Sequence, residues 1–77
     1  MDRHETEDVK AHLMRTSEEF RELARRHQSY DAQVAALESN PHATEQDEIE
    51  EHRLKKLKLR LKDQMEEMMI RHKAQHV

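Results

Sequence analysis

The sequence predicts an all-α protein: an antiparallel, coiled-coil-like two-helix hairpin with a short helix before it. Three observations support this prediction. Apolar residues recur at alternating steps of three and four, a heptad rhythm typical of helices that pack along a seam. The chain has no Gly and one Pro, and good helix formers dominate it. One break, at Pro41, divides the rhythm into two long segments, so we expect residues 1–77 to form a single helical domain.

The composition limits the classes of function open to this chain. Charged residues make up 40% of its 77 residues and aromatic residues 3%, and the net charge is −3. The absence of Cys excludes disulfides, thiolate metal ligands and a thiol nucleophile. The sequence contains no catalytic constellation and no apolar run of membrane-spanning length. We therefore expect a cytoplasmic, non-enzymatic protein that has no cofactor, no bound metal and no contact with a membrane.

The N-terminal segment is compatible with two arrangements. Residues 16–19, Thr-Ser-Glu-Glu, fit a capping box with Thr16 as the cap, which favours a short separate helix over about 5–14. Leu13 nevertheless keeps the heptad phase of the residues that follow, as it would in one continuous helix. In either case the first long helix covers about 17–39.

The turn is expected at residues 40–44. Asn40 precedes Pro41, which disfavours the helical conformation for Asn40. Thr44 is a candidate N-cap, and the carboxylates that follow it complement the positive end of a helix dipole. The second long helix therefore covers about 45–73.

Each long helix carries a narrow apolar stripe, and a short turn makes the two stripes face each other. Two registers fit the stripes. In one of them Tyr30 faces Leu54, and in the other, shifted by one heptad, Leu37 faces Leu54. The short turn favours the first register. The side chains expected along the seam are Phe20, Leu23, His27, Tyr30, Val34, Leu37, Leu54, Leu57, Leu61, Met65 and Met68.

Six basic residues in the second helix form a basic cluster, a pattern that also occurs on surfaces that bind nucleic acid. On a helix they divide into two rows that flank the apolar stripe, where heptad proteins place charges that pair across helices. No aromatic residue is interleaved for base stacking. We therefore interpret the rows as seam-flanking charges and keep nucleic-acid binding as the alternative function. The basic cluster consists of Arg53, Lys55, Lys56, Lys58, Arg60 and Lys62.

Two histidine positions suggest a special role. His72 and His76 are four residues apart and share a helix face, but no third ligand falls in register with them. We interpret them as part of an exposed polar C-terminus rather than as a metal site. His27 occupies a seam position, where it either fixes the register or lies at the edge with a ring nitrogen in water.

Apolar side chains outside the main stripe predict an oligomer face. Leu59 and Ile70 lie roughly opposite the stripe of the second helix, and Met69 widens the stripe on one side. Small two-helix units usually self-associate because a single hairpin buries little apolar surface. We expect a homo-oligomeric helical bundle that serves as a protein-interaction or scaffold module for a protein partner that the sequence does not identify.

One pattern runs from the first long helix into the second. It consists of Phe20, Leu23, His27, Tyr30, Asp31, Val34 and Glu38, followed at residues 54–65 by Leu-Lys-Lys-Leu-Lys-Leu-Arg-Leu-Lys-Asp-Gln-Met. Over about residues 20–68 the chain resembles the YdcH family of small bacterial proteins, a family of unknown function. Tyr30 and Val34 replace the more usual Leu and Ile but remain apolar. The resemblance implies a bacterial, cytosolic helical hairpin and supplies no activity.

Overall fold

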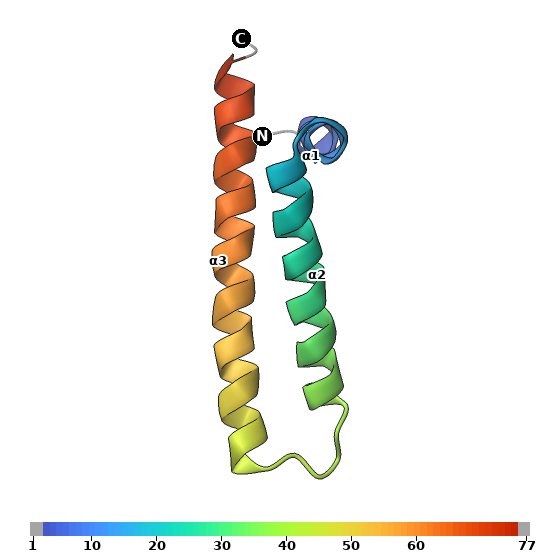
Figure 1. Cartoon of the computed structure of the whole chain (residues 1–77), viewed down its shortest axis with the longest axis vertical. Helices are drawn as coiled ribbons and strands as arrows, with labels where there is room; N and C mark the ends of the chain where they lie inside the picture. The colour runs from blue at the N-terminus through green and yellow to red at the C-terminus, as the bar shows by residue number, and fades with distance from the viewer. Residues whose placement is uncertain (1–2, 76–77) are drawn as a thin grey trace.

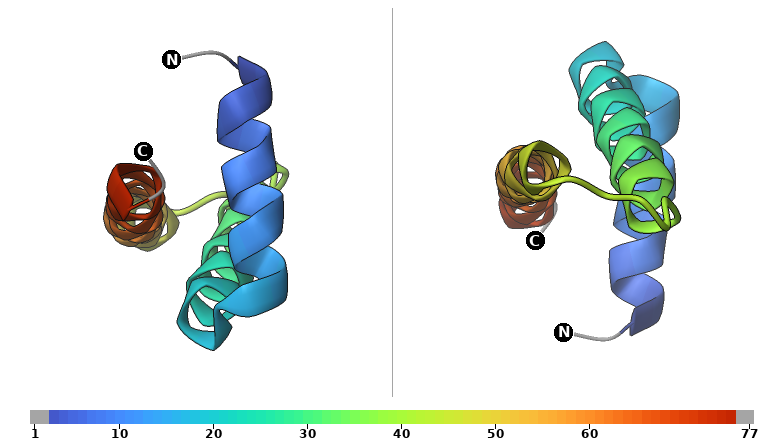
Figure 2. Two further views of the ribbon diagram at one scale, coloured as in Figure 1. Left: turned by 90° about the horizontal axis from the view of Figure 1, so that it is seen from above. Right: turned by 90° about the horizontal axis from the view of Figure 1, so that it is seen from below.

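The computed structural model describes residues 3–75, which form three helices and no strand. The helices are α1 (Arg3–Thr16), α2 (Glu18–Glu38) and α3 (Glu45–Gln75). α2 and α3 lie side by side and run in opposite directions, and α1 lies at the end of the hairpin far from the turn (Figure 1). Seen along the hairpin, α1 runs across the other two helices rather than parallel to them (Figure 2). The molecule is a rod of 51 × 23 × 17 Å.

A break between Thr16 and α2 separates the first two helices. Ser17 has an extended backbone, with φ −117° and ψ 113°, and its Oγ accepts a hydrogen bond from the backbone N–H of Phe20 at 3.1 Å. The hydroxyl of Thr16 instead donates to the carbonyl of His12 at 2.9 Å, within its own helix. The cap is therefore Ser17, and the expectation that Thr16 would cap the helix is wrong. The alternative of one continuous helix is also wrong.

The side chain of Arg21 in α2 forms hydrogen bonds with the C-terminal end of α1. Its Nη1 atom donates to the carbonyls of Met14 and Arg15, each at 3.1 Å. The last carbonyls of a helix lack partners within that helix, so a side chain from the next helix satisfies them here. This contact fixes the direction in which α1 leaves the hairpin.

α1 also contacts the C-terminal part of α3. Leu13 is buried, and the rings of His12 and His72 lie 4.7 Å apart between centroids with a tilt of 32°. Oε1 of Glu5 lies 4.0 Å from Nζ of Lys73. This Nζ atom is buried, and it has no hydrogen-bond partner within the described part of the chain. A ring contact and a long ion pair thus join the two helices.

Local hydrogen bonds define the link between α2 and α3. The N–H of Ser39 donates to the carbonyl of Ala35 at the end of α2, and Thr44 immediately precedes α3. Oγ1 of Thr44 accepts from the N–H of Asp47 at 3.2 Å, and Oδ2 of Asp47 accepts from the N–H of Thr44 at 3.0 Å. This reciprocal pair is a capping box with Asp in the third helical position, so Thr44 is the N-cap that the sequence predicts.

Thr44 should contribute more to stability than Pro41. We expect Thr44→Ala to lower the free energy of unfolding by about 0.5–2 kcal/mol, because the backbone N–H of Asp47 loses its hydrogen-bond acceptor. Pro41→Ala should cost less, since Pro41 is exposed and lies outside the helices. Urea melts followed by circular dichroism measure both changes, and a larger loss for Pro41→Ala would contradict this account of the link.

The pairing of α2 with α3 follows the register that the short turn disfavours. Nζ of Lys58 lies 2.9 Å from Oδ1 of Asp31, and Nζ of Lys55 lies 3.1 Å from Oε1 of Glu38. Both pairs match the register shifted by one heptad, so the register favoured by the sequence is wrong. Residues 39–44 link the two helices through turns at Ser39 and at residues 41–42, and the first turns of α3 project beyond the end of α2 (Figure 1).

Five apolar side chains are buried in the described part of the chain. They are Leu13, Phe20, Val34, Leu54 and Leu61, of which Phe20 and Leu54 are the most completely enclosed. The other expected seam residues are half-buried: Leu23, His27, Tyr30, Leu37, Leu57, Met65 and Met68. The core is thus a single file of side chains between two helices, with α1 covering one end.

Candidate interaction surface

Leu59 and Ile70 are apolar side chains on the face of α3 that points away from α2. Their exposed fractions are 57% and 59%. They are about three helical turns apart, so they lie nearly on one line along the helix. Lys55, Lys62 and Glu66 flank this line and are also exposed. We call Leu59 and Ile70, with the charged side chains beside them, the outer face of α3.

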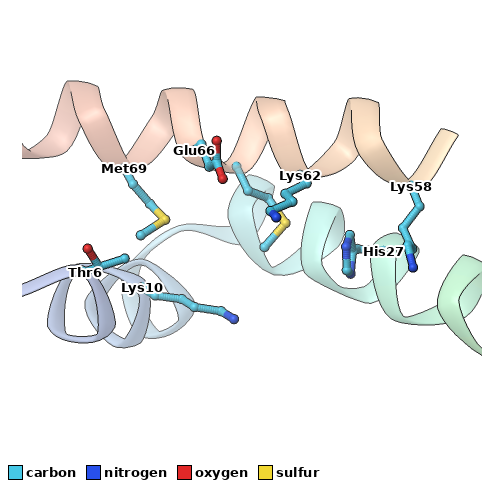
Figure 3. A pocket seen from close by; sticks show the side chains of 8 residues that line it. Thr6, Lys10, His27, Lys58, Lys62, Glu66 and Met69 are labelled. Carbon is cyan, nitrogen blue, oxygen red and sulfur yellow. The ribbon is translucent and has the colours of Figure 1, made fainter. Parts of the chain in front are cut away.

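Met69 differs from the other two residues expected on an oligomer face. Its side chain is half-buried and points toward Thr6 of α1 (Figure 3). Met69 therefore belongs to the junction of α1 with the hairpin. The apolar part of the outer face is narrower than the sequence indicates, because α1 crosses beside it.

Ile49 is an exposed apolar residue that the sequence analysis did not single out. Its exposed fraction is 63%, and it lies in the first turns of α3, which project beyond α2. The only sequence signal for Ile49 was an apolar side chain at a position outside the heptad stripe, which was also the signal for Leu59. On a helix Ile49 is rotated by about 80° from Leu59, so it does not extend the same line.

Two lysines in one row of the basic cluster, Lys55 and Lys58, form ion pairs with acidic residues. Nζ of Lys58 contacts Asp31 of α2 at 2.9 Å, and Nζ of Lys55 contacts Glu38 of α2 at 3.1 Å. Lys55 also lies 3.0 Å from Oε1 of Glu51 in its own helix. These side chains bridge the two helices along one edge of the seam, the role that their spacing predicts for seam-flanking charges.

The second row of the basic cluster consists of Arg53, Lys56 and Arg60 and lies on the other side of the seam. Arg53 pairs with Glu50 of the same helix. Lys56 and Arg60 are exposed, and within residues 3–75 neither forms an ion pair. This row therefore leaves two cations that α2 does not neutralise.

The ion pairs across the seam shift the ionisation of their partners. The hydrogen bond and the charge of Lys58 lower the pKa of Asp31, and those of Lys55 lower the pKa of Glu38. Hydrogen bonds with Glu51 and Glu38 raise the pKa of Lys55. All of these groups lie at the surface, where solvent screens such pairs and limits what each adds to stability.

Stability should fall in acid because of these carboxylates. A carboxyl group whose pKa is lower in the folded state stabilises the fold above its unfolded pKa, and this stability is lost as the pH falls through the folded value. The ordinary values are 3.8 for Asp31 and 4.5 for Glu38, so the melting temperature should decrease below about pH 4.5. Lys58→Met should make that decrease shallower, whereas Lys56→Met should leave its shape unchanged. Thermal melts of both variants at a series of acidic pH values test this prediction. The same dependence of melting temperature on pH in the two variants would contradict it.

The described residues contain neither a metal cluster nor a membrane-spanning helix. Within residues 3–75, no three His, Asp or Glu side chains gather closely enough to hold a metal ion. None of the helices in that range is both long and apolar enough to cross a bilayer. His76, one of the two histidines considered as ligands, lies outside the described residues, and His72 packs against His12.

Comparison with known proteins identifies the hairpin as a family unit. No curated protein and no solved structure matches the chain significantly. The model of a protein family of unknown function, DUF465, matches residues 20–69, which comprise nearly all of α2, the link and most of α3. YdcH-like proteins, which the sequence pattern resembles, are members of this family. Because the match covers more than half of the chain, this protein belongs to the DUF465 family.

Proposed function

We propose that this chain is a non-enzymatic protein-interaction module that works as a helical bundle of identical copies, joined through the outer face of α3. The observation that carries the proposal is the line formed by Leu59 and Ile70, two large apolar side chains more than half exposed on one helix. Single exposed apolar residues are common, but two aligned on a highly charged helix favour a contact. The small core of the hairpin supports the same conclusion, because association adds buried apolar surface.

The occupant that suits this face best is a second copy of the same helix in antiparallel orientation. Two-fold symmetry then places Leu59 opposite Ile70 of the second copy, and Ile70 opposite Leu59. In this arrangement Lys62 lies close to Glu66 of the second copy. A parallel arrangement would instead place Leu59 opposite Leu59 and Ile70 opposite Ile70 of the second copy. The opposite charges of Lys62 and Glu66 support the antiparallel pair.

Cysteine cross-linking tests this arrangement, because the chain has no Cys of its own. We expect a mixture of the Leu59→Cys and Ile70→Cys proteins to form mixed disulfide dimers under mild oxidation. Leu59→Cys alone should cross-link poorly, since the two cysteines would lie about 16 Å apart along the helices, too far for a disulfide. Asn40→Cys, in the exposed link, is the control for random collision. Efficient cross-linking of Leu59→Cys with itself would overturn the antiparallel arrangement.

A second candidate function is binding to nucleic acid, supported by the two exposed cations Lys56 and Arg60. Under the interaction-module proposal, this chain should give no gel shift with random duplex DNA or RNA at physiological salt. A shift at micromolar protein that weakens steeply with added salt would instead favour the second candidate. As a scaffold, the bundle would also bind a further protein, and co-purification at a fixed stoichiometry would identify it.

A further inference from the structure

A cleft of about 440 Å³ lies where α1 crosses the hairpin (Figure 3). α1 contributes Thr6 and Lys10 to its lining, α2 contributes His27, and α3 contributes the remaining wall. The volume falls within the range of small-molecule sites, roughly 300–1,000 Å³. α1 lies outside the residues that match the family, so the cleft depends on a part of this chain beyond the family hairpin.

The apolar part of the lining consists of methionine side chains. Met65 and Met69 lie one helical turn apart on α3, and both are half-buried, so part of each remains accessible from the cleft. Thioether side chains are flexible and polarisable, and they adapt to apolar ligands of different shape. This wall suits an aliphatic group better than a fully hydrated ion.

The charged part of the lining is mostly basic. Lys10 reaches the cleft from α1 and Lys62 from α3 (Figure 3), and neither forms an ion pair within the described residues. Lys58 also lines the cleft, but its ammonium is already paired with Asp31. Glu66 is the one carboxylate among the lining residues. The cleft therefore offers two available cations beside an apolar wall.

We propose that this cleft binds a small organic anion with a short aliphatic tail. The head group, a carboxylate or a similar anion, pairs with Lys10 and Lys62, and the tail lies against Met65 and Met69. The volume of the cleft suits a small molecule better than a helix or a peptide strand. Leu59 and Ile70 do not line the cleft, whereas Lys62 and Glu66 border both the cleft and the outer face of α3. Lys10 of α1 belongs to the cleft alone, so Lys10→Met tests this inference separately from the interface between copies.

Octanoate is a suitable probe, because it combines one carboxylate with a seven-carbon tail. In a titration followed by amide chemical shifts, we expect saturable changes at Thr6, Lys10 and Met65, with a dissociation constant on the order of 1 mM. Acetate lacks the tail and 1-octanol lacks the charge, so each should bind much more weakly. No saturable change with octanoate, or equal binding of acetate or of 1-octanol, would overturn the proposal.

A matched pair of lysine variants separates a site from general charge attraction. Lys62→Met should weaken octanoate binding about tenfold, because a charge-assisted contact is lost. Lys56→Met removes the same charge from an exposed position outside the cleft and should leave the affinity nearly unchanged. Lys10→Met provides a second test on a different helix, and amide spectra show whether each variant remains folded. Equal effects of Lys62→Met and Lys56→Met would overturn the proposal.

Discussion

Replacing Leu54 with alanine should unfold much of the hairpin under conditions in which the wild type is folded. Leu54 is among the most completely buried side chains, with 2% of its surface exposed between α2 and α3. Truncation of a buried Leu costs about 2–5 kcal/mol, because apolar contacts are lost and a cavity remains. Small domains have total stabilities of about 5–15 kcal/mol, so this loss is a large fraction of the whole. Urea and thermal melts followed by circular dichroism measure it.

Ile49→Ala is the matched control for Leu54→Ala, because it removes the same number of carbon atoms from the same helix. Ile49 is 63% exposed and lies where α3 projects beyond α2, so its truncation should cost less than about 1 kcal/mol. Similar losses for the two variants would contradict the observed position of the core.

Replacing Leu59 with glutamate should separate the copies of the bundle while each hairpin keeps its helices. The new carboxylate would lie at the proposed contact opposite Ile70 of the second copy, where association would bury it without a partner. Burial of an unpaired charge costs about 3–5 kcal/mol, which weakens association at least about a hundredfold. Sedimentation velocity measures the change in mass, and circular dichroism measures the helix content that should persist.

Gln46→Glu adds the same charge at an exposed position in the first turn of α3. This control should assemble like the wild type. If Leu59→Glu also assembled like the wild type, the outer face of α3 would not be the contact between copies. If Leu59→Glu lost its helices instead, Leu59 would have a role in the hairpin itself.

The fold could be predicted from the sequence wherever local signals determine it. Thr44 and the carboxylates after it mark the start of α3, and the two apolar stripes supply the buried and half-buried side chains of the seam. The register could not be predicted in the same way, because two heptad alignments bury equivalent side chains. The path of residues 39–44 decides between them, because it lets the first turns of α3 project beyond the end of α2 (Figure 1). No residue in that link predicts this path.

The surface features could likewise be predicted only where the local sequence determines them. Leu59 and Ile70 are visible in the sequence because they fall outside the heptad phase of a long helix. The position of Met69 depends on the crossing of α1, which Arg21 helps to fix through contacts six and seven residues back along the chain. The cleft is formed by side chains from all three helices, so it becomes visible only once α1 is placed.

Sedimentation equilibrium of the wild-type chain tests the central claim most directly. A single chain has a mass of 9.3 kDa. At micromolar concentration we expect the average mass to reach at least twice this value and to decrease on dilution, as mass action requires. A mass that stays at that of one chain over the whole concentration range would contradict self-association through the outer face of α3.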